Sequence, residues 1–227
     1  MKLKWGALVV DGRGKIGGHV ASKNRGGAYL RTKVTPVNKQ SSYQLDVRNR
    51  FTGLSQGWRG LAVTDIAAWN AAVAGYAKTD IFGDVHQPSG FSLYQRLNNN
   101  LETCGEAALA TPPLPEAVGI VVAGVLTATA AGGLLSQVIG AAVPADTKVK
   151  VYATAPQSPG KSFVKSNYRL IQIVAAAAPS PLNLKAAYDL KFGSVGPAGQ
   201  KIFVKLIAVN TNTGQEGTPS SSEAIVV

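Results

Sequence analysis

The sequence predicts an α+β multidomain protein that has a basic glycine-rich β arm, a small three-helix unit and a C-terminal β-sandwich. The charge is unevenly spread over the 227 residues, with a net charge of +9 over residues 1–50, −3 over 51–118 and +5 over 119–227. Apolar residues follow a strand-like pattern before residue 40, recur at helical spacing to about residue 110, and become strand-like again after residue 117. The expected parts are therefore residues 1–39, 40–110 and 117–227, with a proline-rich linker over residues 111–116.

The arm, residues 1–39, is expected to form short strands joined by tight turns. Strand-like stretches at 7–10, 16–21 and 28–34 are separated by glycines, and Asp11-Gly12 is a pair that favours a hairpin turn. Such an arm has little hydrophobic core of its own. We expect it to lie against a partner or against the helices that follow.

Three helices are expected between residues 40 and 110. The first covers about 41–60, with Ser41 or Ser42 as its N-cap. The second runs from Asp65 to about Tyr76 behind a Thr64 cap. The third begins after Pro88 with Ser89 as cap and ends at Gly105. The side chains expected to face the helical core include Leu45, Phe51 and Leu54, and the aromatic packing residues are Trp58, Trp69, Phe91 and Tyr94.

After residue 117 the pattern favours strands, near 119–129, 136–143, 147–155, 167–175, 182–192, 201–209 and 222–227. Roughly seven strands in about 110 residues are typical of an immunoglobulin-like β-sandwich. The uncharged stretch 117–145 exceeds the ~20 residues of a membrane helix. Its glycines, and its acidic flanking residues Glu116 and Asp146, favour strands instead. We therefore expect no membrane span.

The end of the chain carries a more specific pattern. An alternating strand over 202–210 is followed by a turn at Gly214, a Pro219-Ser220 step and a last strand over 223–227. This order resembles the last two strands of a fibronectin type III domain. The resemblance implies that four side chains face the core: Ile202, Val204, Leu206 and Ala208. The family's corner tyrosine, due near Ile202, and its buried tryptophan are both missing, and the resemblance implies no activity.

Several motifs follow one another in the N-terminal half. They are the glycine-rich stretch 17–31, then Pro36-Val37-Asn38, Trp58-Arg59-Gly60-Leu61, Ala68-Trp69-Asn70, and a helix with Gly90, Phe91, Leu93, Tyr94, Leu97 and Asn98. Their order over about 100 residues is similar to that of phage- and prophage-encoded proteins of largely unknown function. The resemblance implies a phage structural protein, often with an appended immunoglobulin-like domain. It supplies no catalytic residues.

The cysteine, the histidines, the aspartates and the glycine motifs of the sequence predict no catalytic, cofactor or metal site. One cysteine and two histidines exclude a disulfide scaffold and a cysteine-based zinc site. Gly12–Gly17 fits G-x-G-x-x-G, but a strand-like stretch and not a helix follows it. Cys104 is expected to be a structural thiol and His19 and His86 to be solvated or capping side chains. Asp80 and Asp84 hold a divalent cation at most weakly.

The basic arm is the part of the sequence that predicts binding, because its positive charge attracts acidic partners. Its expected partner-contact residues are Lys15, Lys23, Arg25, Tyr29, Arg31 and Lys33. Such an arm binds either an acidic protein surface or nucleic-acid phosphates, unless it only solubilises the chain. Glycine-rich strands favour backbone pairing with a protein partner.

We therefore expect a non-enzymatic virion structural protein, assembled in the host cytoplasm and present in many copies or as a homo-oligomer. The expected role is a capsid-associated auxiliary or decoration protein that binds other virion proteins, in the capsid shell or the connector. Two alternatives stay open. One is a tail or head–tail connector component, and the other is a nucleic-acid-binding protein that uses the arm on DNA.

Overall fold

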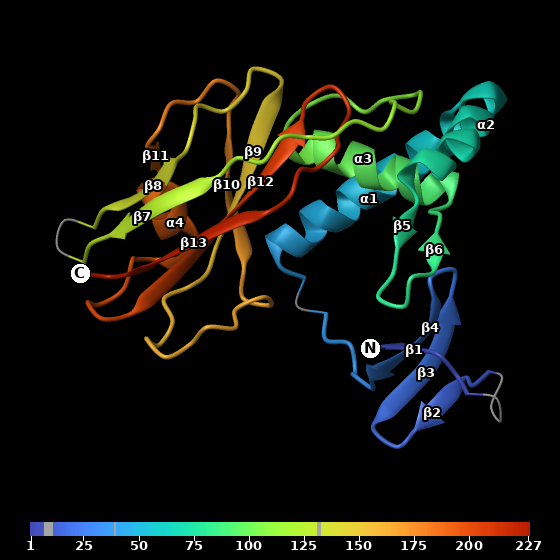
Figure 1. Ribbon diagram of the computed structural model, residues 1–227, viewed down its shortest axis with the longest axis horizontal. Coiled ribbons are helices and arrows are strands. Elements are labelled where there is room, and N and C mark those ends of the chain that lie inside the picture. The colour runs from blue at the N-terminus through green and yellow to red at the C-terminus, as the bar shows by residue number, and fades with distance from the viewer. Residues whose placement is uncertain (7–10, 39, 131–132) are drawn as a thin grey trace. The chain divides into compact units, whose positions relative to one another are not determined.

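The computed structural model describes residues 1–6, 11–38, 40–130 and 133–227 (Figure 1). It is a mixed α+β structure with antiparallel sheets, which confirms the predicted class. Contacts divide the chain into two units, Met1–Gln95 and Arg96–Val227. The expected strand at 7–10 lies outside the described residues.

The described residues of the first unit begin with a four-stranded antiparallel sheet in the order β1-β4-β3-β2. Its strands are β1 (Lys2–Leu3), β2 (Gly14–Ile16), β3 (His19–Asn24) and β4 (Gly27–Thr32). The strand expected over 16–21 is interrupted, because Gly17 has a positive φ of 56° and starts the turn between β2 and β3. Among the described residues of these strands Ala21 alone is buried, so the sheet has little core of its own.

The helices of the N-terminal half lie close to the expected positions. They are α1 (Ser42–Gly60), α2 (Val63–Ala72), the 3₁₀ turn η1 (Val73–Tyr76) and α3 (Gly90–Thr103). Ser41 caps α1 by accepting the Gln44 N–H, and Ser89 caps α3 by accepting the Ser92 N–H. The Thr64 cap was wrong, since α2 already begins at Val63 and has no side-chain cap. Between η1 and α3, β5 (Lys78–Thr79) and β6 (Val85–His86) form a hairpin.

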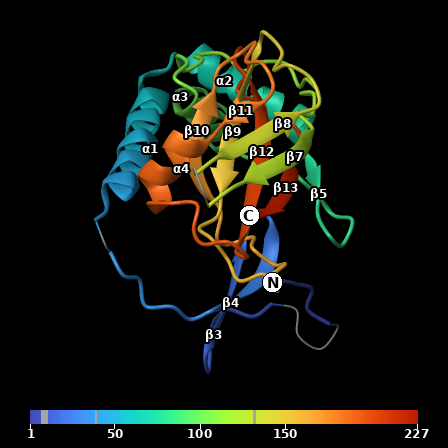
Figure 2. The same cartoon turned by 90° about the vertical axis from the view of Figure 1, so that its left-hand side faces the viewer.

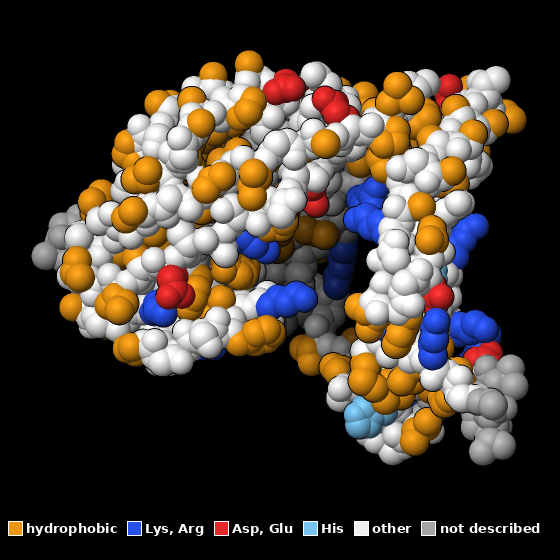
Figure 3. All heavy atoms as spheres, in the orientation of Figure 1, with side chains coloured by type: hydrophobic (Ala, Val, Ile, Leu, Met, Phe, Trp, Pro, Cys, Tyr) orange, Lys and Arg blue, Asp and Glu red, His pale blue; other side chains and the backbone are white. Residues whose placement is uncertain are grey.

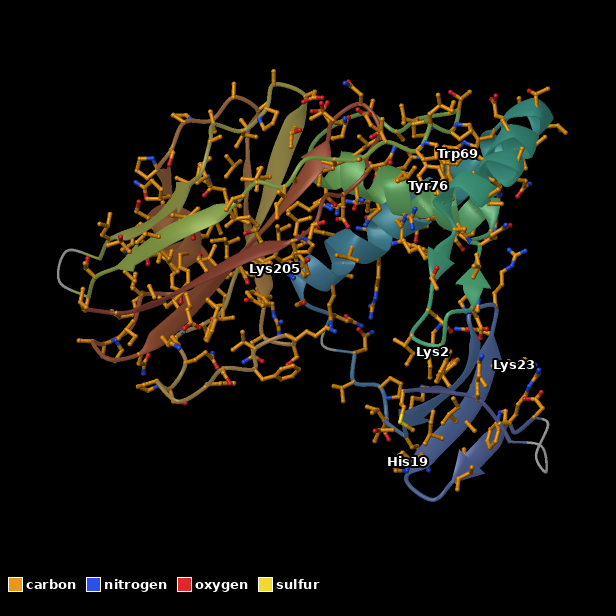
Figure 4. All side chains as sticks on the ribbon, in the orientation of Figure 1. Lys2, His19, Lys23, Trp69, Tyr76 and Lys205 are labelled. Carbon is orange, nitrogen blue, oxygen red and sulfur yellow. The ribbon has the colours of Figure 1, made fainter. Side chains whose placement is uncertain are left out.

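Four aromatic side chains hold α1, α2 and α3 together. Trp58 lies 5.7 Å from Phe91 and 5.3 Å from Tyr94, measured between ring centroids. The Trp69 ring lies 5.4 Å from Tyr94 and is fully buried (labelled in Figure 4). The apolar stripe on α1 is less buried than its spacing predicts, because Leu45 and Phe51 are exposed and Leu54 is buried.

The described residues of the second unit form two antiparallel sheets, with strand orders β11-β8-β7 and β10-β9-β12-β13. Their bounds are β7 (Ala123–Ala128), β8 (Leu135–Ile139), β9 (Thr147–Ala153), β10 (Arg169–Val174), β11 (Leu182–Asn183), β12 (Lys201–Asn210) and β13 (Ser220–Ile225). In Figure 2, β7 and β8 pass in front of β12. The stretch 117–145 thus supplies two strands, and no helix of the described residues is long and apolar enough to cross a bilayer.

One hydrophobic core joins the two sheets. Leu126, Leu135 and Ile139 enter it from the shorter sheet, and Val149 and Val151 enter it from the longer one. The four β12 residues expected to face inward all belong to this core: Ile202, Val204, Leu206 and Ala208.

The strand expected over 182–192 was wrong. The chain forms only the short β11 there and then a helix, α4 (Lys185–Phe192). Leu184, Tyr188 and Phe192 are spaced four apart, which places them on one helix face, and they pack on the core. The Tyr188 hydroxyl donates to the Thr154 carbonyl over 2.9 Å, and burial raises the pKa of this tyrosine well above its usual value.

The part of α3 from Arg96 onward belongs to the second unit. Leu97 and Leu101 are buried, and the turn at Gly214 between β12 and β13 lies against them. A Cβ on Gly214 would overlap the Leu97 carbonyl oxygen, and Gly214 has a φ of +68°. The division between the units therefore falls inside α3, whereas the sequence places it in the linker 111–116.

Replacing Trp69 by alanine is expected to lower the free energy of unfolding by about 3–5 kcal/mol, because a fully buried aromatic position is emptied. Chemical denaturation of the full chain measures it. Val63→Ala is the control on the same helix, since Val63 is 82% exposed and its truncation should change stability by less than about 0.5 kcal/mol. Equal effects of the two variants would contradict the packing described here.

Gly214→Ala is expected to destabilise the second unit by more than about 1 kcal/mol, because it adds steric overlap with α3 to backbone strain. Gly160→Ala is the matched control, since a Cβ there meets nothing within 4 Å. Thermal unfolding followed by near-ultraviolet circular dichroism compares the two variants. A Gly214→Ala protein as stable as the wild type would show that the turn does not press on α3.

Candidate interaction surface of the N-terminal sheet

The strand register decides which basic side chains share a face of the N-terminal sheet. Directly opposed residues in antiparallel strands point to the same side. Val20 is opposite both Lys15 and Arg31, and Tyr29 is opposite Lys2. Lys2, Lys15, Tyr29 and Arg31 therefore lie on one side of the sheet, which we call the basic face.

The remaining expected partner-contact residues lie elsewhere. Lys23 is opposite Ala28 and belongs to the other side of the sheet, together with His19. Arg25 is in the turn between β3 and β4, and Lys33 follows the end of β4. Figure 4 labels His19 and Lys23, and Figure 3 shows one face of the molecule with Lys and Arg side chains in blue and histidine in pale blue. The six residues predicted as one contact set thus divide between two faces and the ends of strands.

Four of these basic residues carry charge that no carboxylate neutralises. Lys15, Arg25, Arg31 and Lys33 are exposed and make no ion pair within the described parts of the chain. By contrast, Lys23 and Arg13 both approach Asp11, at 4.0 and 3.5 Å. The uncompensated charge of the basic face therefore comes from Lys15 and Arg31.

Asp80 ties the first strand to the β5–β6 hairpin. Its carboxylate accepts hydrogen bonds from Lys2 Nζ at 3.0 Å and from the Phe82 N–H at 2.7 Å, and it lies 3.1 Å from His86 Nε2. Burial alone would raise the pKa of Asp80, but these hydrogen bonds outweigh it and hold the pKa well below its usual value. Asp80 therefore stays ionised at neutral pH, and its partner Lys2 is neutralised.

A hollow of about 180 Å³ lies beside this cluster, with Lys4, Trp5, Lys23 and Phe82 among its lining residues. Lys4 forms an ion pair with Asp84 at 2.9 Å, so the walls carry both signs of charge. The hollow is therefore a weaker anion site than the basic face. The two aspartates considered for a cation are paired with lysines, and the described residues contain no group of three or more potential metal ligands.

The other motifs do not assemble into a site. Gly12–Gly17 contains β2 and is followed by a hairpin turn into β3, so no helix N-terminus follows it to hold a pyrophosphate. Cys104 is buried at the end of α3, and burial raises the pKa of its thiol. His86 contacts Asp80 in the first unit.

No family model, curated protein or solved structure matches the chain. The similarity of the N-terminal half to phage proteins and of the C-terminal end to fibronectin type III domains therefore stays a prediction from the sequence.

Asp80 is expected to make the stability of the first unit depend on pH. Because its pKa is lower in the folded state, its contribution is present above the unfolded pKa of about 4 and is lost as the pH falls below it. Urea unfolding between pH 7 and pH 3 measures this loss. The Asp80→Asn variant is expected to be less stable than the wild type at pH 7 and to lose less free energy of unfolding on acidification. The exposed Asp46→Asn is the control, and the prediction fails if both variants follow the wild-type pH profile.

Proposed function

We propose that this chain is a phage virion structural protein, a capsid-associated auxiliary or decoration protein present in many copies. Its basic N-terminal half anchors it, and its C-terminal unit is the displayed domain. The observation that carries the proposal is the basic face, where Lys15 and Arg31 are exposed and have no ion-pair partner among the described residues. A sheet that buries so little of its own surface gains stability by packing against a partner.

The strand order supports a fibronectin type III identity for the displayed domain. Its first, second and fifth strands form one sheet, and its fourth, third, sixth and seventh strands form the other. This is the arrangement expected of that family, whereas a constant-type immunoglobulin domain has its fourth strand in the sheet of the first. The inward residues of β12 agree with it, and the missing corner tyrosine and tryptophan are the departures.

An acidic protein surface, in the capsid shell or connector, fits the basic face better than DNA does. β2 forms one edge of the sheet and is exposed along its length, so a protein strand has a backbone edge to pair with beside Lys15. A tail or head–tail connector protein offers the same chemistry and remains an alternative position. A nucleic-acid-binding protein is the second alternative, since Lys15 and Arg31 also suit phosphates.

The test is incorporation of the Lys15→Glu/Arg31→Glu variant into particles of a phage that encodes this chain. We expect at least a tenfold loss of incorporation with an unchanged thermal melt, because the reversed charges repel an acidic surface. Lys23→Glu is the matched control on the opposite face of the same sheet. Equal loss from Lys23→Glu, or wild-type incorporation of the double variant, would remove the basic face as the anchor.

The nucleic-acid alternative has its own measurement. Fluorescence anisotropy with random duplex DNA at near-physiological salt is expected to show no binding. Binding that weakens steeply with added salt and disappears in the double variant would instead favour DNA as the partner.

A further inference from the structure

A lysine, an asparagine and a glutamate meet inside the second unit, where α3 packs on β9. The Lys150 side chain is only 4% exposed, and Asn100 at the end of α3 is also buried. Lys150 Nζ lies 2.7 Å from Asn100 Oδ1 and 3.0 Å from Glu216 Oε1. The proposed virion role uses none of these three side chains.

The amide of Asn100 is held at both ends. Its Oδ1 accepts the hydrogen bond from Lys150, and its Nδ2 donates to the Gly214 carbonyl over 2.8 Å. Because Cγ is bonded to Oδ1 over about 1.2 Å, the lysine nitrogen is within about 4 Å of the atom that a nucleophile attacks. Fixing two reacting groups in this way removes most of the entropic cost of bringing them together.

Glu216 completes the set of groups that amide exchange requires. An ammonium is no nucleophile, so a base must first take its proton, and a carboxylate at 3.0 Å is within reach. The Glu216 side chain is 41% exposed, so water reaches its carboxylate, while Lys150 and Asn100 are shielded from water that would compete in the reaction. Glu216 alone would be enough to neutralise a buried lysine. Here the same lysine nitrogen also donates a hydrogen bond to a side-chain amide carbonyl.

We propose that Lys150 and Asn100 join in an intramolecular isopeptide bond, with Glu216 as the proton carrier. Glu216 takes a proton from the Lys150 ammonium, and the freed lone pair on Nζ attacks Cγ of Asn100, which pushes the carbonyl electron pair onto Oδ1. The protonated Glu216 then gives its proton to Nδ2 and takes one from Nζ. The carbonyl re-forms, the Cγ–Nδ2 bond breaks, and the nitrogen leaves as ammonia, which takes the proton held by Glu216 and departs as ammonium. Nothing is oxidised or reduced, and no co-reactant enters.

Neighbouring lysines lack this arrangement and serve as controls. Lys148, on the same side of β9, contacts Glu106 and the backbone carbonyl of Cys104, and no side-chain amide is among its contacts in the described residues. Lys205 on β12 lies 4.7 Å above the rings of Tyr152 and Tyr168 (labelled in Figure 4). Neither has a carbonyl carbon of a side-chain amide to attack.

Intact-mass spectrometry of the folded full-length chain tests the proposal. The expected mass is about 17 Da below the sequence mass, which is one ammonia. Proteolysis of the denatured protein is expected to yield a branched peptide that contains both Asn100 and Lys150. A full sequence mass after prolonged incubation of the folded wild type would overturn the proposal.

Variants separate the cross-link from other losses of ammonia. Lys150→Arg keeps the charge and the hydrogen-bond donors, so it should fold and show its full sequence mass, whereas Lys148→Met should keep the deficit. A succinimide formed by Asn100 alone would survive in Lys150→Arg, and that result would contradict the proposal. Glu216→Gln still accepts a hydrogen bond but takes no proton, so its cross-linking should slow at least tenfold. Unchanged kinetics would remove Glu216 from the step.

Discussion

The close approach of the Gly214 turn to α3 is the constraint that creates a second, smaller interior in the second unit, apart from the core between its two sheets. Because Gly214 has no side chain, the turn comes close to the Leu97 carbonyl. The Gly214 carbonyl in turn accepts a hydrogen bond from Asn100 Nδ2. This contact buries Leu97 and Leu101 and sets Asn100 against Lys150 on β9. The outer side of the longer sheet, which would otherwise face water at this point, thus becomes a second small interior that holds polar groups. Its polar atoms are costly to bury, and their mutual hydrogen bonds offset that cost.

The first unit follows a different principle. Its sheet is held by tight turns, by backbone pairing and by the ion pairs of Lys2 and Lys4 with the hairpin, and it buries one small residue in its described strands. An exposed ion pair such as Lys4–Asp84 adds little stability, typically below about 1 kcal/mol. Such a sheet keeps its remaining charges exposed at the surface, which is what the proposed binding to an acidic surface requires.

Elements with a strong local pattern could be predicted from the sequence. The three helices of the N-terminal half and the long β12 strand lie close to their predicted positions, and the end signals Ser41, Ser89 and Gly105 mark α1 and α3, whereas α2 has no side-chain cap. The α4 region failed because its short apolar pattern fits either a strand or a helix, although Leu184 and Tyr188 carry the helical spacing. The division of the basic residues between two faces could not be predicted, because it depends on the strand register. A shift of one residue in the register moves every side chain of a strand to the other face.

The candidate sites could not be predicted from the sequence, because their residues are far apart in the chain and only the fold brings them together. The residues that meet Lys150 are 50 and 66 positions away from it, and Lys2 and Asp80 are 78 apart. No local pattern marks such pairs, since their proximity is created by the packing of α3 on β9 and of the hairpin on β1. The sequence shows at this site only a lysine in a strand of alternating polar and apolar residues. In that pattern Lys150, between Val149 and Val151, looks like an ordinary outward-facing residue.

The contact between Asn100 and Lys150 also determines how the chain would carry tension. These two residues enclose the proline-rich linker and the strands β7 and β8, which lie between them in sequence. A covalent joint at this point would pass a pull on the N-terminal half directly from α3 to β9, so that neither the linker nor the first two strands is stretched. By the loop-closure relation for cross-links, a closed segment of this size also removes unfolded-state entropy worth about 4 kcal/mol. The second unit would then resist unfolding when the chain is pulled from its α3 end.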